Sequence, residues 1–286
     1  MKRYTANFLY QYNADIAVVL FTTALKLLGF EPKYMTIFFD EFEKSLDDIV
    51  YNEEYLFKLL RKRPGTITIK SQLYDEDTRE TNHWFRFGLS IDSPFGLDTC
   101  SLEWSNTSLN FLVESDKFII FLNSQNLIYA YCYDQYDCMN ESNNRIDSFI
   151  REYPNRPYKL AKDHLDDDVI DISEHWGRYV STRGITFLAA PLMWFGEEYF
   201  KIIPKEALLK FKGASIINYP SFNLVHIKLF ELYDDPAKTD NRQRQKDFWK
   251  TLDLQKKAEQ YEKDRPFDFI AWYKERATAK KKKKIK

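Results

Sequence analysis

Glycine is scarce in this chain: 286 residues contain only 8 glycines, and none of them cluster. The P-loop and the Gly-x-Gly-x-x-Gly pattern are both absent, so the sequence argues against nucleotide binding. Gly-x-Ser-x-Gly, which surrounds the nucleophile of many hydrolases, is absent too. The 3 cysteines are too few for a disulfide framework and indicate a reducing compartment.

No apolar run is long enough to span a bilayer. The longest, Ile16 to Phe30, contains two threonines and Lys26 and is shorter than the roughly 20 residues that a spanning helix needs. No small-x-small cleavage site follows, because Phe30-Glu31-Pro32 comes next. We therefore expect a buried helix there, a cytoplasmic protein and no membrane partner.

The net charge of −1 hides an uneven distribution of basic residues. Six lysines stand at the C-terminus, at 280–284 and 286, and the rest of the chain has 36 basic against 43 acidic residues. An acidic body disfavours nucleic acid as a partner and suits a basic protein surface, although it also simply keeps a protein in solution. The lysine tail has no interleaved aromatics, which is typical of a disordered terminus.

Residues 1–157 predict an N-terminal α+β subdomain. Its first helix starts at Asn13 or Asp15 and ends at Leu28, and a second covers Thr36 to Lys62. Apolar alternation then predicts an antiparallel meander with one buried face, and a helix near Asn143 to Tyr153 follows. The predicted strands lie near residues 67–73, 85–91, 102–104, 109–113 and 118–122. Pro154 and Pro157 mark the boundary of this subdomain.

Residues 158–264 predict a second α+β subdomain, which resembles half of a ferredoxin-like unit. Its order is strand, helix, strand, strand, helix, over 185–195, 204–211, 215–219, 223–232 and 239–252. Another helix covers Leu254 to Lys263, and residues 265–286 form a C-terminal segment ending in the lysine tail. The expected fold class is α+β, antiparallel with helices packed on one side. Whether the two subdomains share one sheet stays open.

An acidic connector from Asp163 to Glu174 separates these two patterns. Six carboxylates stand in it without a lysine or arginine. The segment lacks the glycine that an EF-hand calcium loop needs at its sharp turn, so a solvated loop or a docking patch for a basic partner is the better interpretation. The candidate partner-binding residues are Asp166, Asp167, Asp168, Asp171 and Glu174.

The sequence predicts no metal site, cofactor or catalytic residue. The four histidines show no His-x-x-x-His or His-Glu-x-x-His arrangement, and Cys132 and Cys138 have no second cysteine pair. Strand alternation places Val225 and Ile227 on one face, so we expect His226 to point outward. Glu197-Glu198 could act in general acid–base chemistry, but a polar strand end explains this pair more simply.

Met193-Trp194-Phe195-Gly196 predicts a core strand that ends at a tight turn, where Gly196 permits a positive φ. Trp194 and Trp249 are then packing anchors. The alternative is that one of these aromatics is exposed as an anchor for a binding partner.

This motif also carries a resemblance. The segments Ala190-Pro191-Leu192-Met193-Trp194-Phe195-Gly196, Phe200-Lys201-Ile202-Ile203-Pro204 and Val225-His226-Ile227-Lys228-Leu229-Phe230 precede Asn241-Arg242-x-x-Gln245-x-x-Phe248-Trp249. Together they resemble an α+β family of bacterial immunity proteins that are encoded beside polymorphic toxins, some with restriction-endonuclease-like nuclease domains. The match covers about the C-terminal third, and its motif residues are Met193, Trp194, Phe195, Gly196, Asn241, Arg242, Gln245, Phe248 and Trp249.

The resemblance implies a cytoplasmic immunity protein that neutralises a cognate toxin by binding, in bacterial competition of the kind that includes type VI secretion. It supplies no catalytic residues. The expected mechanism is occlusion of a toxin that has a basic surface. Two alternatives remain, a hydrolase that uses dispersed carboxylates and a structural component of a secretion or phage-like apparatus. The sequence does not fix the oligomeric state.

Overall fold

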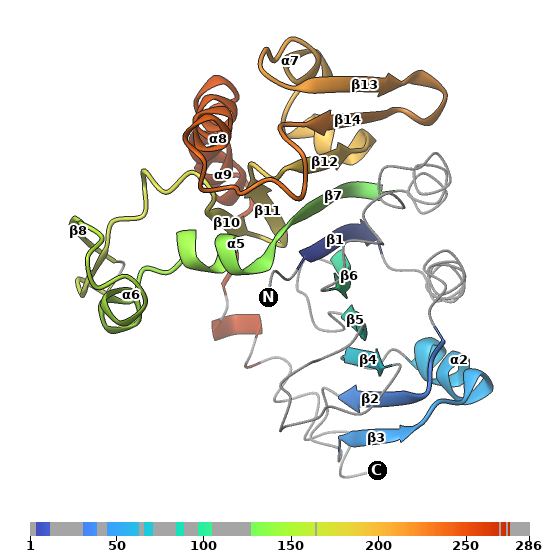
Figure 1. Ribbon diagram of the computed structural model, residues 1–286. Coiled ribbons are helices and arrows are strands. Elements are labelled where there is room, and N and C mark those ends of the chain that lie inside the picture. The colour runs from blue at the N-terminus through green and yellow to red at the C-terminus, as the bar shows by residue number, and fades with distance from the viewer. Residues whose placement is uncertain are drawn as a thin grey trace.

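A ten-stranded antiparallel sheet runs through the part of the chain that the structure describes (Figure 1). The computed structural model describes residues 4–11, 31–38, 45–62, 66–70, 84–88, 97–104, 127–163, 165–268, 270–272 and 274. The strand order is β13-β14-β12-β7-β1-β6-β5-β4-β2-β3, and helices accompany the sheet, which confirms the α+β class. Within these residues, no helix combines the length and the apolar character needed to cross a membrane.

The N-terminal elements confirm the meander and correct one helix. They are β1 (Tyr4–Gln11), β2 (Tyr34–Phe38), β3 (Leu46–Val50), α2 (Glu53–Lys62), β4 (Thr66–Lys70), β5 (Trp84–Gly88), β6 (Leu97–Trp104) and β7 (Leu127–Asp134). β4, β5 and β6 pair in sequence as antiparallel neighbours. The helix predicted over 13–28 and the strands predicted at 109–113 and 118–122 lie outside the described residues.

The helix predicted from Thr36 to Lys62 is wrong over its first half. Within the described part of this range the helix is Glu53–Lys62, and residues 34–38 and 46–50 form two strands, β2 and β3. Met35 and Ile37 of β2 are fully buried and stand opposite Ile69 and Ile67 of β4. Strand pairing on both sides of β2 therefore decides the structure here, over the helical spacing of the apolar residues.

The C-terminal elements follow the predicted order. They are α5 (Gln135–Glu141), α6 (Ile146–Glu152), β8 (Leu160–Lys162), β9 (Asp168–Ile170), β10 (Tyr179–Thr182), β11 (Ile185–Leu188), β12 (Leu192–Phe195), the 3₁₀ helix η2 (Glu197–Lys201), α7 (Lys205–Leu209), β13 (Ser215–Tyr219), the 3₁₀ helix η3 (Pro220–Phe222), β14 (Leu224–Lys228), α8 (Thr239–Thr251) and α9 (Leu254–Lys263). β12, α7, β13, β14 and α8 give the strand-helix-strand-strand-helix order.

The single strand predicted over 185–195 is two strands in different sheets. β11 pairs with β10, whereas β12 pairs with β7 and β14. Ala189-Ala190-Pro191 separates them, and a proline lacks the backbone N–H that a continuous ladder would need. The Pro191 carbonyl instead accepts a hydrogen bond from the Leu229 amide at 2.9 Å.

β7 joins the two halves of the chain into one sheet. It pairs with β1 on one side and with β12 on the other, so the sheet crosses the boundary predicted near Pro154 and Pro157. The division into residues 1–157, 158–264 and 265–286 remains a prediction. The sheet itself is continuous through β7.

β12 is buried on both faces. Met193 and Phe195 pack into the main core with Ile227 of β14 and with the apolar side of α8. On the other face the Trp194 ring stacks on His226, with centroids 4.7 Å apart and planes 6° apart. Both motif tryptophans are packing residues, since Trp194 is 0% and Trp249 3% exposed.

His226 faces away from Ile227 as expected but does not reach solvent. It is 6% exposed, because this second face of β14 is covered as well. Burial, together with nearby Lys228, lowers the pKa of His226 to about 4, so the imidazole is neutral at physiological pH.

Gly196 is required for space and not for a special backbone angle. Its φ is −101°, which corrects the expectation of a positive φ. A Cβ at this position would lie 1.9 Å from the carbonyl oxygen of Leu127, whose strand is β7. The Gly196 amide donates to the Ile128 carbonyl at 2.9 Å. The glycine therefore lets β12 end directly against the backbone of β7.

Replacement of Gly196 by alanine is expected to destabilise the protein by about 3 kcal/mol, because backbone must move to admit the methyl group. Gly213→Ala is the matched control: φ is +109° there, but the nearest atom that a Cβ would meet, Cζ of Phe211, is 3.9 Å away, so the cost should be only about 1 kcal/mol. Urea denaturation measures both values. Equal costs in the two variants would contradict the close approach at Gly196.

Candidate functional site

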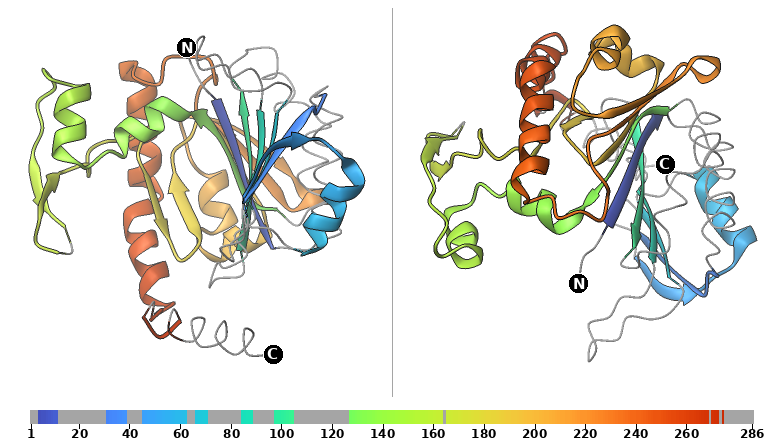
Figure 2. Two further views of the ribbon diagram at one scale, coloured as in Figure 1. Left: turned by 90° about the horizontal axis from the view of Figure 1, so that it is seen from below. Right: turned by 45° about the horizontal axis from the view of Figure 1, so that its top comes forward.

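Residues 143–174 form an arm that stands away from the rest of the molecule (Figures 1 and 2). The arm contains α6 and the antiparallel hairpin of β8 and β9. Two backbone hydrogen bonds of 2.8 Å join separate parts of the arm. The Ile170 amide donates to the Asn144 carbonyl, and the Asp171 amide donates to the Lys159 carbonyl. The arm is therefore a folded unit with its own hydrogen bonds.

Phe149 forms the small core of the arm. Its side chain is fully buried, and the rings of Tyr153, Tyr158 and His175 surround it at centroid distances of 5.5 to 5.9 Å. The guanidinium of Arg156 lies over the Phe149 ring, 5.6 Å from its centroid. This packing keeps the hairpin in place although the arm lies far from the main core.

All five candidate partner-binding residues lie on the arm. Asp166, Asp167 and Asp168 are exposed, where the chain turns from β8 to β9 and at the first residue of β9. Glu174 is exposed at the end of the arm sequence, and Asp171 is partly exposed. The structure thus brings the predicted acidic group together on one projecting element.

Hydrogen bonds give the acidic turn a defined shape. The carboxylate of Asp163 accepts from the amides of Leu165 and Asp167 at 2.8 and 3.0 Å, and Asp166 has a φ of +66°. Hydrogen bonds from Ser173 lower the pKa of Asp171. Lysines on the arm offset part of the charge, since Lys162 lies 3.0 Å from Asp168 and Lys159 lies 3.6 Å from Glu174. The turn remains mainly anionic.

Exposed apolar side chains accompany the acidic turn, and sequence reasoning missed them. Leu165, inside the turn, is 69% exposed, and Leu160 on β8 is 54% exposed. Ile150 and Tyr158 are also exposed on the arm. A leucine between aspartates in a loop is the signal that sequence alone offered. An apolar centre with a charged surround is typical of protein-binding surfaces.

A groove of about 670 Å³ lies between the arm and the two C-terminal helices. The hairpin and the segment that leads to β10 line one side, and residues from Trp249 to Glu259 line the other. Trp176, Arg178 and Trp249 all contribute to its wall. We call this cavity the arm groove. Asp163 and Asp171 line it as well, so it is continuous with the predicted acidic patch.

A buried polar cluster fixes the root of the arm to the body. Arg242 of α8 holds the Asp137 carboxylate of α5 with both terminal nitrogens, one at 3.0 Å. It also donates to Gln245 at 2.6 Å, and Gln245 donates to the Ala189 carbonyl at 2.9 Å. Burial raises the pKa of Asp137 and outweighs the opposing effect of Arg242. The network joins α8, α5 and the link between β11 and β12.

Glu141 and Gly177 complete this cluster, and no sequence pattern had singled them out. The Glu141 carboxylate is buried, accepts from Arg156 of the arm at 3.0 Å and lies 3.6 Å from Arg242. A Cβ on Gly177 would lie 2.5 Å from Nη1 of Arg242 and 2.9 Å from Glu141. The motif residues Asn241, Arg242 and Gln245 are therefore structural, with Asn241 donating to the Asp235 carbonyl at 3.0 Å.

The residues weighed for chemistry are not assembled into a reactive site. Glu197 and Glu198 are exposed on η2, and Glu198 pairs with Lys201 at 2.6 Å. Cys132 and Cys138 are buried thiols, and burial raises the pKa of Cys138 far above its usual range. Among the described residues, no group of three His, Cys, Asp or Glu side chains is placed to hold a metal ion.

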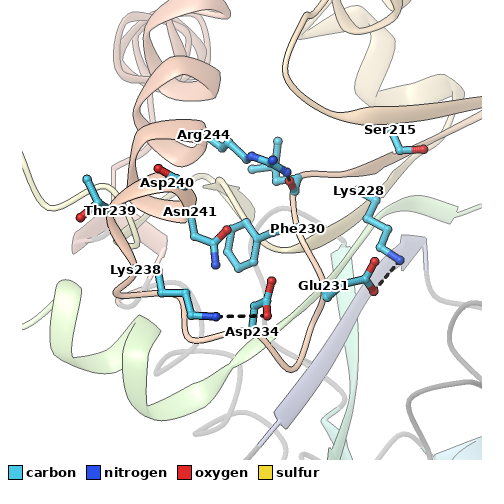
Figure 3. A pocket seen from close by; sticks show the side chains of 11 residues that line it. Ser215, Lys228, Phe230, Glu231, Asp234, Lys238, Thr239, Asp240, Asn241 and Arg244 are labelled. Carbon is cyan, nitrogen blue, oxygen red and sulfur yellow. Dashed lines mark hydrogen bonds and ion pairs between the residues drawn. The ribbon is translucent and has the colours of Figure 1, made fainter.

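A second pocket, of about 600 Å³, lies beside the start of α8 (Figure 3). Its charged side chains have partners within the pocket: Lys228 pairs with Glu231 at 2.6 Å and Lys238 with Asp234 at 3.5 Å. Arg244 donates to the Leu229 carbonyl at 2.6 Å. Since its cations are already engaged, this pocket is a weaker candidate for ligand binding than the arm groove.

Comparison with known proteins bears on the fold. No family model matches the chain, and no curated protein matches it in sequence. A solved structure, the Pseudomonas aeruginosa T6SS protein PA0821, is similar, with a TM-score of 0.53 and 9% sequence identity. The similarity covers 88% of this chain and 73% of that one. The two proteins therefore share an overall fold.

Proposed function

We propose that this protein is a bacterial immunity protein that binds and occludes a cognate toxin in the cytoplasm of the producing cell. The arm is the observation that carries the proposal. It presents an acidic turn and exposed leucines on an element that projects from the body, a shape and chemistry suited to covering a basic cleft. A nuclease is one toxin whose substrate-binding cleft would be basic.

Two further observations support a binding role without catalysis. The motif residues shared with the immunity family serve packing and the buried cluster, and Glu197 and Glu198 stand on an exposed 3₁₀ helix away from both pockets. The likeness in fold to a T6SS protein agrees with a place in bacterial competition. Likeness to a type VI secretion system protein is also compatible with a structural component of a secretion apparatus. Such a component would self-assemble, and sizing chromatography would then show large species.

Co-expression with the neighbouring toxin gene tests the proposal. We expect a large open reading frame beside this gene to be lethal when expressed alone and tolerated when this protein is present. The two proteins should then co-purify. Absence of both protection and co-purification would remove the immunity function.

Reversal of the charges at Asp166, Asp167 and Asp168 to lysine is expected to slow association with the toxin by ~10-fold or more at low salt. Opposite fields accelerate encounter, and salt screens them, so the difference should shrink at high ionic strength. Stopped-flow association measures the rate. A triple reversal at the exposed residues Glu231, Asp247 and Asp264 changes net charge equally but lies off the arm. Equal rates in wild type and the arm variant would exclude the acidic turn from the interface.

A further inference from the structure

Arg178 is a buried cation in the wall of the arm groove. The side chain is 4% exposed and lies between two tryptophans, with its guanidinium carbon 4.2 Å from the ring centroid of Trp249 and 5.6 Å from that of Trp176. Stacking on aromatic faces orients the planar guanidinium and leaves its edge for hydrogen bonds. The segment that carries Arg178 connects the arm to β10.

Among the described residues, Arg178 has no carboxylate within ion-pair distance, although the charges of Asp171 and Glu141 are near enough to raise its pKa against the effect of burial. In the described part of the chain it makes no ion pair and donates one hydrogen bond, from Nη1 to the His175 carbonyl at 3.0 Å. A guanidinium has five N–H donors. By contrast, the neighbouring arginines Arg156 and Arg242 both hold carboxylates. Burial lowers the pKa of Arg178 to about 10, so the group still carries its charge at neutral pH.

A second donor in the groove wall also lacks an acceptor. Nε1 of Trp249 is buried and has no hydrogen-bond partner within the described residues. Buried donors without acceptors are costly in a folded protein. Asp171 lines the same groove, but its carboxylate accepts from the Ser173 amide and is not within ion-pair distance of Arg178. Arg178 therefore keeps N–H groups that no acceptor among the described residues satisfies, although carboxylates line other parts of the groove.

The charged residues that line the groove restrict what can enter. Asp163, Asp171, Asp253 and Glu259 line it together with Lys162 and Lys250. These carboxylates repel a phosphate dianion or a nucleic acid strand more strongly than an anion of a single charge. A single carboxylate is planar, fits the two-nitrogen edge of a guanidinium and carries one charge. A carboxylate flanked by basic residues would also match the acidic residues of the groove lining.

We propose that the arm groove binds a carboxylate side chain of the cognate toxin, and that Arg178 is its hydrogen-bonding partner. The identity of the protein that carries the carboxylate rests on the proposed function, whereas the chemistry of the groove does not. In this arrangement the acidic turn meets basic residues of the toxin, and the groove receives an aspartate or glutamate that stands among them. Charge pairs of opposite sense on one interface fix its register.

The first experiment tests the groove without the toxin. N-acetyl-L-glutamate α-methylamide, which carries one carboxylate, and its glutamine counterpart are titrated at constant ionic strength, with tryptophan fluorescence as the signal. We expect a saturable change for the glutamate compound alone, with a Kd on the order of 10 mM. Arg178→Gln should abolish the change. Arg183→Gln should retain it, because Arg183 does not line the groove and pairs with Glu262. Melting temperatures check that both variants fold.

If Arg178→Gln does not fold, the test still rests on the wild-type protein, by comparison of its responses to the glutamate and glutamine compounds. An absent or equal response to the two compounds would overturn the carboxylate site. Persistence of the response in a folded Arg178→Gln protein would overturn the role of Arg178.

The second experiment uses the purified toxin domain encoded beside this gene. Loss of one partner of a buried charge pair is expected to weaken the complex by at least ~30-fold in Arg178→Gln and to leave Arg183→Gln near wild type. Equal toxin affinity in Arg178→Gln and wild type would overturn the groove as the toxin site while the immunity function stands. Binding of the glutamate compound without any binding of the toxin would leave the carboxylate site in place and overturn the immunity function.

Discussion

The contact between Arg242 and Asp137 is the interaction on which the arrangement of the arm depends. It crosses 105 positions of sequence and joins α8, which packs on the core, to α5, which leads from the central strand β7 towards the arm. Gln245 and Glu141 extend the same network to β11–β12 and to Arg156 of the arm. A mostly buried pair of this kind adds little net stability when complete, yet loss of one partner leaves the other charge poorly compensated. Its main effect is to allow a single placement of α5.

The fixed placement of α5 matters because binding is weaker when a segment of the protein loses conformational freedom on forming a complex. The arm lies outside the main core, so its orientation relative to the sheet has to come from the connections at its root. The cluster around Arg242 provides them at one end, and the segment through Gly177 and Arg178 provides them at the other. The acidic turn and the arm groove are then held in one fixed relation to each other.

The sequence correctly predicts the helices and strands whose positions depend on local residue patterns. Leu254–Lys263 is helical as predicted, and the strand-helix-strand-strand-helix order is present, since caps, prolines and apolar spacing are local. Sheet pairing makes strands of 34–38 and 46–50 where a helix was predicted, and the covered second face of the sheet buries His226. The acidic residues of the candidate site were found from charge density. Arg178 and Gly177 were not, because the burial of an arginine and the space around a glycine arise only when the arm root, α5 and α8 meet.

A double-mutant cycle at the Arg242–Asp137 contact tests this account most directly. Urea denaturation would give the free energies of unfolding of wild type, Arg242→Ala, Asp137→Ala and the double variant. The account predicts a cost of about 2 kcal/mol or more for each single change, because each removes the two-nitrogen contact and leaves a mostly buried group without its main partner. The double variant should cost about as much as one single change, with a coupling energy of about 2 kcal/mol or more. Costs that simply add, within about 0.5 kcal/mol, would contradict the claim that this pair holds the arm to the body.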